Sequence, residues 1–180
     1  MKTGSLKWMV RTALLAALSL VLMYIETPPL FGTPFLKLDL ADVPAALSGL
    51  AFGPLSGVMV VLIKNLVHLL FTDSAGIGQL ANFLYGSILV LSISLSSKIK
   101  LVKHTTINLL VTGAIGTVIM TIAAYFINLY VIFPMYTLFM PMEALIAFLP
   151  AVIAFNLTKG AVVTALSALL FWRIKDFLVQ

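Results

Sequence analysis

The sequence predicts an all-α integral membrane protein with six transmembrane helices. Of its 180 residues, 62% are hydrophobic and 9% are charged, and the mean hydropathy is +1.15. An average soluble chain has about 25% charged residues, so this chain lacks the polar residues that would cover a water-soluble core. One membrane-spanning helix takes about 20 residues. Six of them with short connections use nearly the whole chain as a single membrane domain, residues 1–180.

The same composition excludes several classes of function. Six spans leave no room for a nucleotide-binding domain or a sizeable extramembrane enzyme. The sequence has no Cys, which excludes disulfides, thiolate nucleophiles and thiolate metal ligands. It also has no Walker A motif, so we expect this chain to bind no ATP.

The first three predicted spans cover residues 8–26, 41–53 and 54–71. The first ends at Glu26-Thr27-Pro28-Pro29, because proline ends a helix and restricts the residue before it, and an external loop over 27–40 follows. Gly53-Pro54 is a strong turn signal inside one long apolar run, so we expect two helices in a hairpin. The shorter one has only about 14 residues, or about 21 Å, and cannot cross the hydrocarbon unless protein covers its outer end.

The other three predicted spans cover residues 79–96, 105–133 and 156–178. An external polar loop over 72–78 precedes the first of them, and a basic connection over 98–104 separates it from the next. The fifth span is expected to stop at Pro134. Residues 134–155 contain Pro141 and Pro150, so we expect an external loop with a short helix that lies over the outer face.

The distribution of charge predicts the orientation of these helices. Cytoplasmic segments of membrane proteins carry an excess of Lys and Arg. Eight of the eleven basic residues fall at the two termini and in the 98–104 connection: Lys2, Lys7, Arg11, Lys98, Lys100, Lys103, Arg173 and Lys175. Five of the six acids fall on the opposite side: Glu26, Asp39, Asp42, Asp73 and Glu143. We therefore expect cytoplasmic N- and C-termini, and the net charge of +5 calls for no nucleic-acid partner.

Lys64 is the most informative polar residue because it lies near the middle of the third predicted span. A bare ammonium that faced lipid there would be prohibitively costly. In the hairpin, residues at equal depth have numbers that sum to about 107, which places Lys64 level with Val43 and beside Asp42. We predict an Asp42–Lys64 ion pair, which either fixes the hairpin or belongs to a ligand site. Lys64→Met separates the two, since a structural role predicts lost expression and a ligand role predicts a folded protein that binds weakly.

Further polar residues approach the outer half of the membrane. Asn82 and Tyr85 form one helical stripe with Gln79, and Asn128, Asn156 and Lys159 fall near the outer ends of the last two spans. Aromatic residues surround them: Tyr125, Phe126, Tyr130, Phe133 and Tyr136. One interpretation is an interfacial aromatic belt with snorkelling polar groups. The other is an outer pocket for a planar, polar-edged and mostly uncharged ligand.

Two other patterns in the sequence say less about function. His68 and His104 are separated by a whole helix, so we expect no metal site, and no arrangement of residues predicts catalysis. Ala13, Ala16 and Ala17 bring small side chains to one side of the first span, a spacing that permits close helix approach in lipid. That surface could pack against a partner or against the protein's own helices, and the spacing alone favours neither.

Six stretches together resemble the riboflavin-specific substrate-binding component (S component) of energy-coupling factor (ECF) transporters, the RibU family. They are Leu36–Pro44, Phe52–Gly57, Leu62–His68, Gly76–Phe83, Tyr125–Asn128 with Phe133–Pro134, and Phe155–Gly160. The resemblance covers nearly the whole chain and implies the six-helix fold of an ECF S component. It also implies a cell-membrane protein that captures riboflavin from outside, with riboflavin as transported ligand and no cofactor.

The same resemblance assigns roles to particular residues. Asn128, Asn156 and Lys159 would hydrogen-bond the polar edge of the isoalloxazine ring, and the loop around Leu38 and Asp39 would close over the ligand. Lys64, Asn82 and Tyr85 complete the expected ligand-binding set. Ala13 and Ala17 would dock on the transmembrane T protein of a complex whose two ATPase subunits hydrolyse ATP and drive vitamin release. Gln79 departs from the family pattern, where Glu is expected in many relatives.

Three alternatives remain open on the sequence. FMN is a second candidate ligand, but its phosphate needs a cation near the ribityl end that the sequence does not place. The chain could be an S component for another vitamin. It could also be a membrane-embedded enzyme that acts on a lipid or a flavin.

Overall fold

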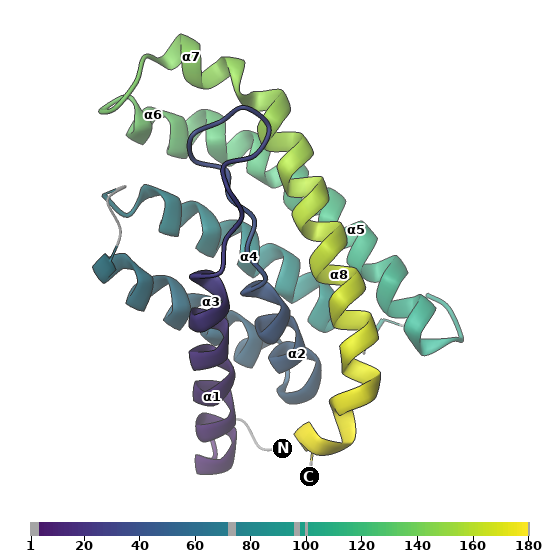
Figure 1. The fold of residues 1–180 in the computed structure, drawn as a ribbon. Helices are drawn as coiled ribbons and strands as arrows, with labels where there is room; N and C mark the ends of the chain where they lie inside the picture. Colours follow the sequence, from purple (N-terminus) through teal and green to yellow (C-terminus); the bar gives the residue numbers. More distant parts are fainter. Residues whose placement is uncertain (1–3, 72–74, 96–97, 100, 180) are drawn as a thin grey trace.

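The structure is a computed structural model that describes residues 4–71, 75–95, 98–99 and 101–179, with the backbone alone for 175–179. These residues form helices, turns and loops, without a strand among them. Both termini lie at one end of the molecule, and the segment between α5 and α8 lies at the other (Figure 1). The elements in order are α1 (Leu6–Met23), α2 (Asp42–Phe52), α3 (Pro54–His68), the 3-10 turn η1 (Leu69–Phe71), α4 (Ile77–Leu95), α5 (Thr105–Ile127), the π turn η2 (Asn128–Ile132), α6 (Phe133–Tyr136), α7 (Met142–Ala147) and α8 (Leu149–Val179).

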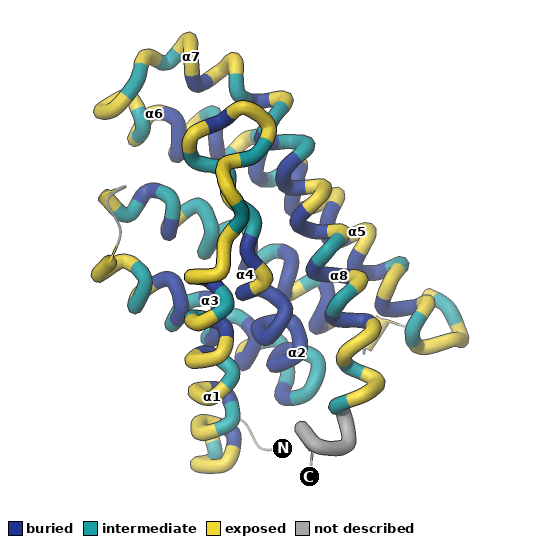
Figure 2. The backbone as a smooth tube through the Cα atoms, viewed as in Figure 1, coloured by how far each residue is buried: buried dark blue, intermediate teal, exposed yellow. Residues whose placement is uncertain are grey.

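The short helix α2 lies at the centre of the bundle. It packs against α1, α3, α4 and α8, and Figure 2 shows it almost entirely buried. Its 11 residues span about 16 Å, roughly half of the hydrocarbon thickness. The protein around it supplies the cover that the sequence required.

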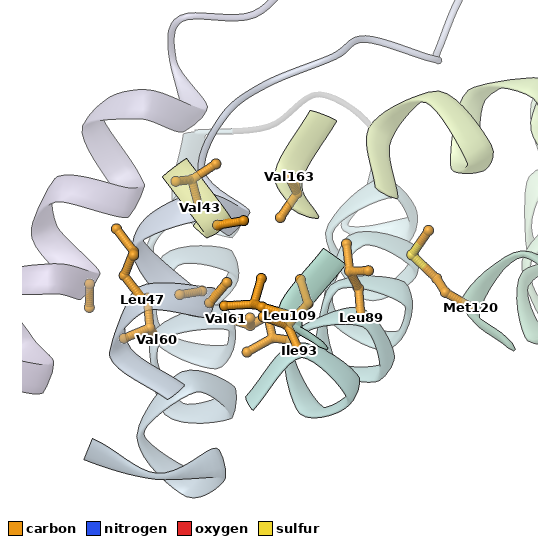
Figure 3. Close-up of a cluster of buried hydrophobic side chains, with 14 residues drawn as sticks. Val43, Leu47, Val60, Val61, Leu89, Ile93, Leu109, Met120 and Val163 are labelled. Atoms are coloured by element: carbon orange, nitrogen blue, oxygen red, sulfur yellow. The ribbon is translucent and has the colours of Figure 1, made fainter. Parts of the chain in front are cut away.

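Five helical segments of the described chain are long and apolar enough to cross a membrane, and α2 is the shorter sixth. The predicted all-α membrane fold of six helices is therefore confirmed. The core between the helices is apolar and draws on α2, α3, α4, α5 and α8 (Figure 3). Its labelled side chains are Val43, Leu47, Val60, Val61, Leu89, Ile93, Leu109, Met120 and Val163.

Glycines allow α5 and α8 to approach closely. A Cβ atom added to Gly113 would lie 2.3 Å from Thr164 Cγ2, and one added to Gly160 would lie 2.4 Å from Thr117 Cγ2. Each helix therefore places a threonine over a glycine of the other. Small residues at such contacts let helices pack tightly in lipid, where the hydrophobic effect does not drive helices together.

The last third of the chain is more helical than expected. The sixth predicted span corresponds to α8, which begins at Leu149 and not at 156. Pro150 is the second residue of α8, where a missing N–H costs no helical hydrogen bond. The fifth does not stop at Pro134, because η2 and α6 continue it to Tyr136. In the π turn the Phe133 N–H bonds Asn128 O, five residues back. A short helix does follow in the connection, as predicted, at α7.

The other helix ends lie within a few residues of those predicted. The first helix covers Leu6–Met23 against an expected 8–26, and α4 begins at Ile77 against 79. The third predicted span matches α3 together with η1. Some residues of the charge argument and one predicted helix end lie outside the described residues: Lys2, Asp73, Ser96, Lys100 and the side chain of Lys175.

The connection over 24–41, called the α1–α2 loop here, rises from the end of α1 toward α6 and α7 before it returns to α2 (Figure 1). Its two arms are joined by backbone hydrogen bonds from Thr27 N to Leu38 O (2.9 Å) and from Leu30 N to Leu36 O (2.8 Å). Lys37 pairs with Glu26 across the same arms. The loop therefore forms an ordered arm over one end of the bundle.

Candidate functional site

A cavity lies beyond the N-terminal end of α2, at the end of the bundle away from the termini. Because α2 is short, its first residue Asp42 stops inside the bundle, and α4, α5 to α6, α8 and the α1–α2 loop enclose the space above it. The cavity has a volume of about 120 Å³, which is room for several water molecules. The lining residues are Phe35, Leu36, Lys37, Asp39, Asp42, Gly78, Ala81, Asn82, Tyr85, Gly86, Met120, Asn128, Ile132, Phe133, Tyr136, Val152, Phe155, Asn156 and Lys159.

The cavity brings together six of the eight predicted ligand-binding residues. They come from four separate parts of the chain: Asp39 on the α1–α2 loop, Asn82 and Tyr85 on α4, Asn128 on η2, and Asn156 and Lys159 on α8. Leu38 and Lys64 are the two predicted residues that do not line it. Leu38 instead holds the base of the loop through its backbone bonds with Thr27.

Four charged residues form a continuous series from the interior to the cavity wall, which we call the charge chain. Lys64 Nζ donates to Asp42 Oδ1 at 2.5 Å, and both side chains are fully buried. The other oxygen of Asp42 lies 3.1 Å from Lys159 Nζ. Lys159 Nζ in turn lies 3.2 Å from Asp39 Oδ2. The predicted Asp42–Lys64 pair is confirmed, and the structure extends it by two further residues.

The charge chain contains two positive and two negative groups, so its formal charge is zero. Buried charges are tolerated when they are paired and hydrogen-bonded. The polar end of the cavity therefore carries no surplus charge that a ligand would have to neutralise.

Lys159 contacts three acceptor groups in the structure. Its ammonium donates hydrogen bonds to Asp39 Oδ2 at 3.2 Å and to Asn82 Oδ1 at 3.3 Å. It also lies 3.1 Å from Asp42 Oδ2, but this contact is an ion pair and not a well-formed hydrogen bond. A ligand that accepts a hydrogen bond from Lys159 therefore competes with these groups for the ammonium.

Asn128 and Asn156 present matching amides from facing helices. Asn128 Nδ2 donates to Ala124 O at 2.7 Å, and Asn156 Nδ2 donates to Val152 O at 2.9 Å. Each bond goes to the residue four positions back on the same helical segment, so neither amide joins two helices. The bond uses one N–H of each amide. The carbonyl oxygen and the second N–H of Asn156 are left for a ligand, whereas the Asn128 side chain also interacts with the Tyr85 hydroxyl.

The aromatic residues divide between the two interpretations that the sequence left open. Phe126 and Tyr130 are 52% and 75% exposed, as expected for an interfacial belt. Phe133 and Tyr136 line the cavity. The hydroxyl of Tyr85, also at the cavity, is buried and makes no well-formed hydrogen bond among the described residues.

Phe35 connects the α1–α2 loop to the far wall of the cavity. Its ring stacks on Tyr136 with centroids 5.6 Å apart and planes 26° apart, and it meets Phe148 edge-on. Sequence reasoning missed Phe35 and Phe155, because nothing in their local pattern separates a cavity-lining ring from a core ring. It left open whether the Asp42–Lys64 pair is structural or belongs to a ligand site, and the structure places Asp42 in the cavity lining.

Gln79 does not follow Asn82 and Tyr85 into the cavity. Its Nε2 lies 2.9 Å from His68 Nδ1 on α3, and the His68 ring lies 5.1 Å from that of Tyr24. The predicted stripe is therefore split, with its first residue at a contact between α3 and α4.

The small residues of α1 are also divided. Ala16 is 2% exposed and belongs to the apolar core, whereas Ala13 and Ala17 are exposed. The yellow face of α1 in Figure 2 has no covering helix. The protein's own helices thus account for Ala16 and leave Ala13 and Ala17 open to a partner or to lipid.

The family described as ECF transporter, substrate-specific component, matches residues 7–171 of the chain. The riboflavin transporter RibU of Staphylococcus aureus (strain TCH60) is 33% identical over 177 residues, which cover 96% of this chain and 92% of that protein. The riboflavin transporter FmnP of Bacillus subtilis (strain 168) is 35% identical over 185 residues, with 97% and 95% covered.

A solved structure agrees with these sequence matches. The S component of a bacterial ECF transporter superposes with a TM-score of 0.81 and 34% sequence identity, over 97% of this chain and 98% of that one. The similarity therefore extends over the whole helical bundle, including every segment that contributes to the cavity.

Proposed function

This chain belongs to the family of substrate-specific components of ECF transporters, and we propose that the substrate it captures is riboflavin. Members of this family are multi-pass membrane proteins that serve transport and are not enzymes. The family therefore excludes the alternative that the chain is a membrane-embedded enzyme.

The cavity is the observation that carries the proposal. Riboflavin has a planar, uncharged ring system with carbonyl oxygens and one N–H along one edge. Asn128 and Asn156 offer amide acceptors and donors, Lys159 offers a donor, and Phe133, Phe155 and Tyr136 offer ring surfaces. The zero formal charge of the charge chain suits a neutral ring. The two curated relatives described above are both named riboflavin transporters.

We assign the remaining predicted residues by their positions. Asn82 and Tyr85 bind the ligand from α4, and Asp39 closes the cavity from the α1–α2 loop. Leu38 acts through the loop backbone, and Lys64 acts from behind Asp42. Residues 1–180 form one membrane domain, with external connections between α1 and α2 and between α6 and α8.

Orientation and partners complete the proposal. The termini and the 98–104 connection carry most of the basic residues, so the positive-inside rule places them in the cytoplasm. The cavity, at the opposite end, then opens outward. A transmembrane T protein docks on Ala13 and Ala17, and two ATPase subunits hydrolyse the ATP that drives release of the vitamin inward.

The test is a titration of the purified chain in detergent with riboflavin. Flavin fluorescence is followed, because contact with aromatic side chains quenches it. We expect saturable quenching by one ligand per chain. A purified chain that neither carries flavin absorbance nor quenches riboflavin fluorescence would contradict the proposal.

Three further experiments test the alternatives and the proposed partners. Other vitamins are added one at a time as competitors. If the chain is an S component for a different vitamin, that vitamin will displace riboflavin. FMN in the same titration tests the second candidate ligand. Uptake into vesicles that depends on added T protein, ATPase subunits and ATP tests the proposed partners.

A further inference from the structure

Lys64 contacts the cavity only through another residue. It is fully buried and its ammonium donates to Asp42 Oδ1 at 2.5 Å. The helix that carries it, α3, contributes no residue to the cavity lining. Lys64 can therefore influence a ligand only through Asp42.

Asp42 lies between two ammonium groups that differ in their exposure to the cavity. Lys64 approaches one carboxylate oxygen from α3, and Lys159 approaches the other from α8 at 3.1 Å. From α4, Gly86 leaves space for this arrangement, since a Cβ atom added there would lie 3.0 Å from Asp42 Oδ1. The remaining charged group at this place, Asp39 on the α1–α2 loop, pairs with Lys159.

The charges balance only when Lys64 is present. Without it, one ammonium would lie between two carboxylates, with a formal charge of −1 at the polar end of the cavity. Charges interact strongly where water is excluded, and an uncompensated buried charge is costly. Lys159 would then be the one cation left for Asp42.

Ligand binding makes this balance important. The Lys159 ammonium donates hydrogen bonds to Asp39 and Asn82 and forms an ion pair with Asp42, so a ligand carbonyl that binds it competes with these partners. Asp42 is fixed by Lys64 in the interior, whereas Asp39 belongs to the loop and Asn82 to the cavity wall. Asp42 is thus the partner that keeps Lys159 in place while another is exchanged.

We propose that Lys64 is a positioning residue for the transported ligand: by neutralising Asp42 it leaves the Lys159 ammonium able to donate to a neutral ligand at the cavity. This inference rests on the proposed riboflavin function. It differs from a direct contact, because Lys64 never touches the ligand. It also differs from a purely structural ion pair, because Asp42 contacts Lys159, which is proposed to donate a hydrogen bond to the ligand.

The test compares Lys64→Met with the double variant Lys64→Met/Asp42→Asn in the riboflavin titration. We expect Lys64→Met to bind about tenfold more weakly, a change typical of residues coupled in one network. The double variant has a charge chain of zero formal charge again, and the amide that replaces the Asp42 carboxylate still presents a carbonyl oxygen to Lys159. We expect it to bind more tightly than Lys64→Met and so to recover part of the lost affinity.

A spectroscopic measurement separates positioning from general loss of structure. Donation by Lys159 to a flavin carbonyl lowers its stretching frequency, which infrared difference spectra of the bound ligand report. We expect this frequency to rise in Lys64→Met and to return toward the wild-type value in the double variant. Thermal unfolding of each purified variant shows whether the bundle is intact.

Asn65→Leu is the matched control, since Asn65 is the next residue of α3, is buried, and donates to Val61 O of its own helix. It should leave affinity and frequency unchanged. If Lys64→Met is not recovered as folded protein, Lys64→Gln, which keeps a donor for Asp42 without the charge, takes its place in the comparison.

The outcomes are distinct. Wild-type protein that does not bind riboflavin contradicts the proposed function itself. Wild-type protein that binds, together with a Lys64 variant of unchanged affinity, overturns the positioning role. A double variant that binds no more tightly than the single one also overturns it, since the loss in Lys64→Met would then not come from the uncompensated charge of Asp42.

Discussion

The ammonium of Lys159 lies 3.2 Å from Asp39 Oδ2, although the two residues are 120 positions apart in the chain. This contact joins the α1–α2 loop to α8 in the wall of the cavity. The same ammonium reaches Asp42 and Asn82, so one side chain holds three parts of the fold together where the ligand is proposed to bind.

Lys159→Gln should therefore weaken both binding and stability. Glutamine keeps a hydrogen-bond donor but leaves Asp39 and Asp42 with one cation fewer. Breaking a buried ion pair costs about 3–5 kcal/mol, so we expect riboflavin affinity to fall at least tenfold and the unfolding temperature to drop. The control is Lys37→Gln at the rim, whose partner Glu26 is half-exposed. That pair is worth about 0–1 kcal/mol, so a loss of affinity there as large as at Lys159 would contradict the assignment.

Asn128→Leu should reduce affinity with little effect on folding. The amide donates to a carbonyl of its own helical segment and does not hold two helices together by that bond, and a ligand group left without its partner costs about 1–3 kcal/mol. That range corresponds to a loss of affinity of roughly 5- to 150-fold. Tyr130→Leu, two residues along and 75% exposed, should bind riboflavin normally in the same titration. Equal affinities for the two variants would remove Asn128 from the site.

Phe35→Ala should speed ligand release more than it slows capture. The Phe35 ring fixes the α1–α2 loop on Tyr136, and an aromatic pair contributes about 0.5–1.5 kcal/mol beyond its buried area. We expect dissociation of riboflavin to become a few-fold faster, as measured by stopped-flow displacement. Phe31→Ala, on the same loop and 48% exposed, is the control. Dissociation unchanged in Phe35→Ala would show that the stack does not retain the ligand.

Ala13→Trp should separate binding from transport. Ala13 is exposed on the uncovered face of α1, so a large side chain leaves the cavity intact but prevents close approach of another helix. We expect normal riboflavin affinity for the isolated chain and loss of ATP-dependent uptake with the partner subunits. The control is Val118→Trp on α5, where Val118 is 51% exposed; this variant should support uptake. Normal uptake by Ala13→Trp would place the T protein elsewhere.

Gly160→Ala should destabilise the contact between α5 and α8. The added Cβ would lie 2.4 Å from Thr117 Cγ2, and such overpacking costs about 1–3 kcal/mol. The unfolding temperature should fall, and Gly160→Ala/Thr117→Ala should recover part of the loss by removing the crowded atoms. Ala161→Leu, at the next and exposed position, should change stability by less than about 0.5 kcal/mol. A double variant no more stable than Gly160→Ala would show that Thr117 is not the obstacle.

Local patterns predicted the helices and the first half of the charge chain. Asp42 and Lys64 lie on two arms of one tight hairpin, so their proximity follows from the turn at Gly53-Pro54 and the helical rise. The positions of Pro134 and Pro150 were misjudged for an equally local reason. Proline is tolerated at the start of a helix and after a π turn. The local sequence does not show that a helix starts at Leu149 or that a π turn precedes Pro134.

The sequence by itself determined that this is a six-helix membrane protein, which family it resembles, and which polar residues lie toward the end of the bundle away from the termini. Composition, hydrophobic run length and turn residues act over a few helical turns, so they can be read along the chain. Only the tertiary structure decided that Lys159 and Asp39 join Asp42, that Lys64 lies behind the cavity wall, and that Tyr136 faces inward while Tyr130 faces outward. Those outcomes depend on which faces of distant helices are packed together around the short helix α2.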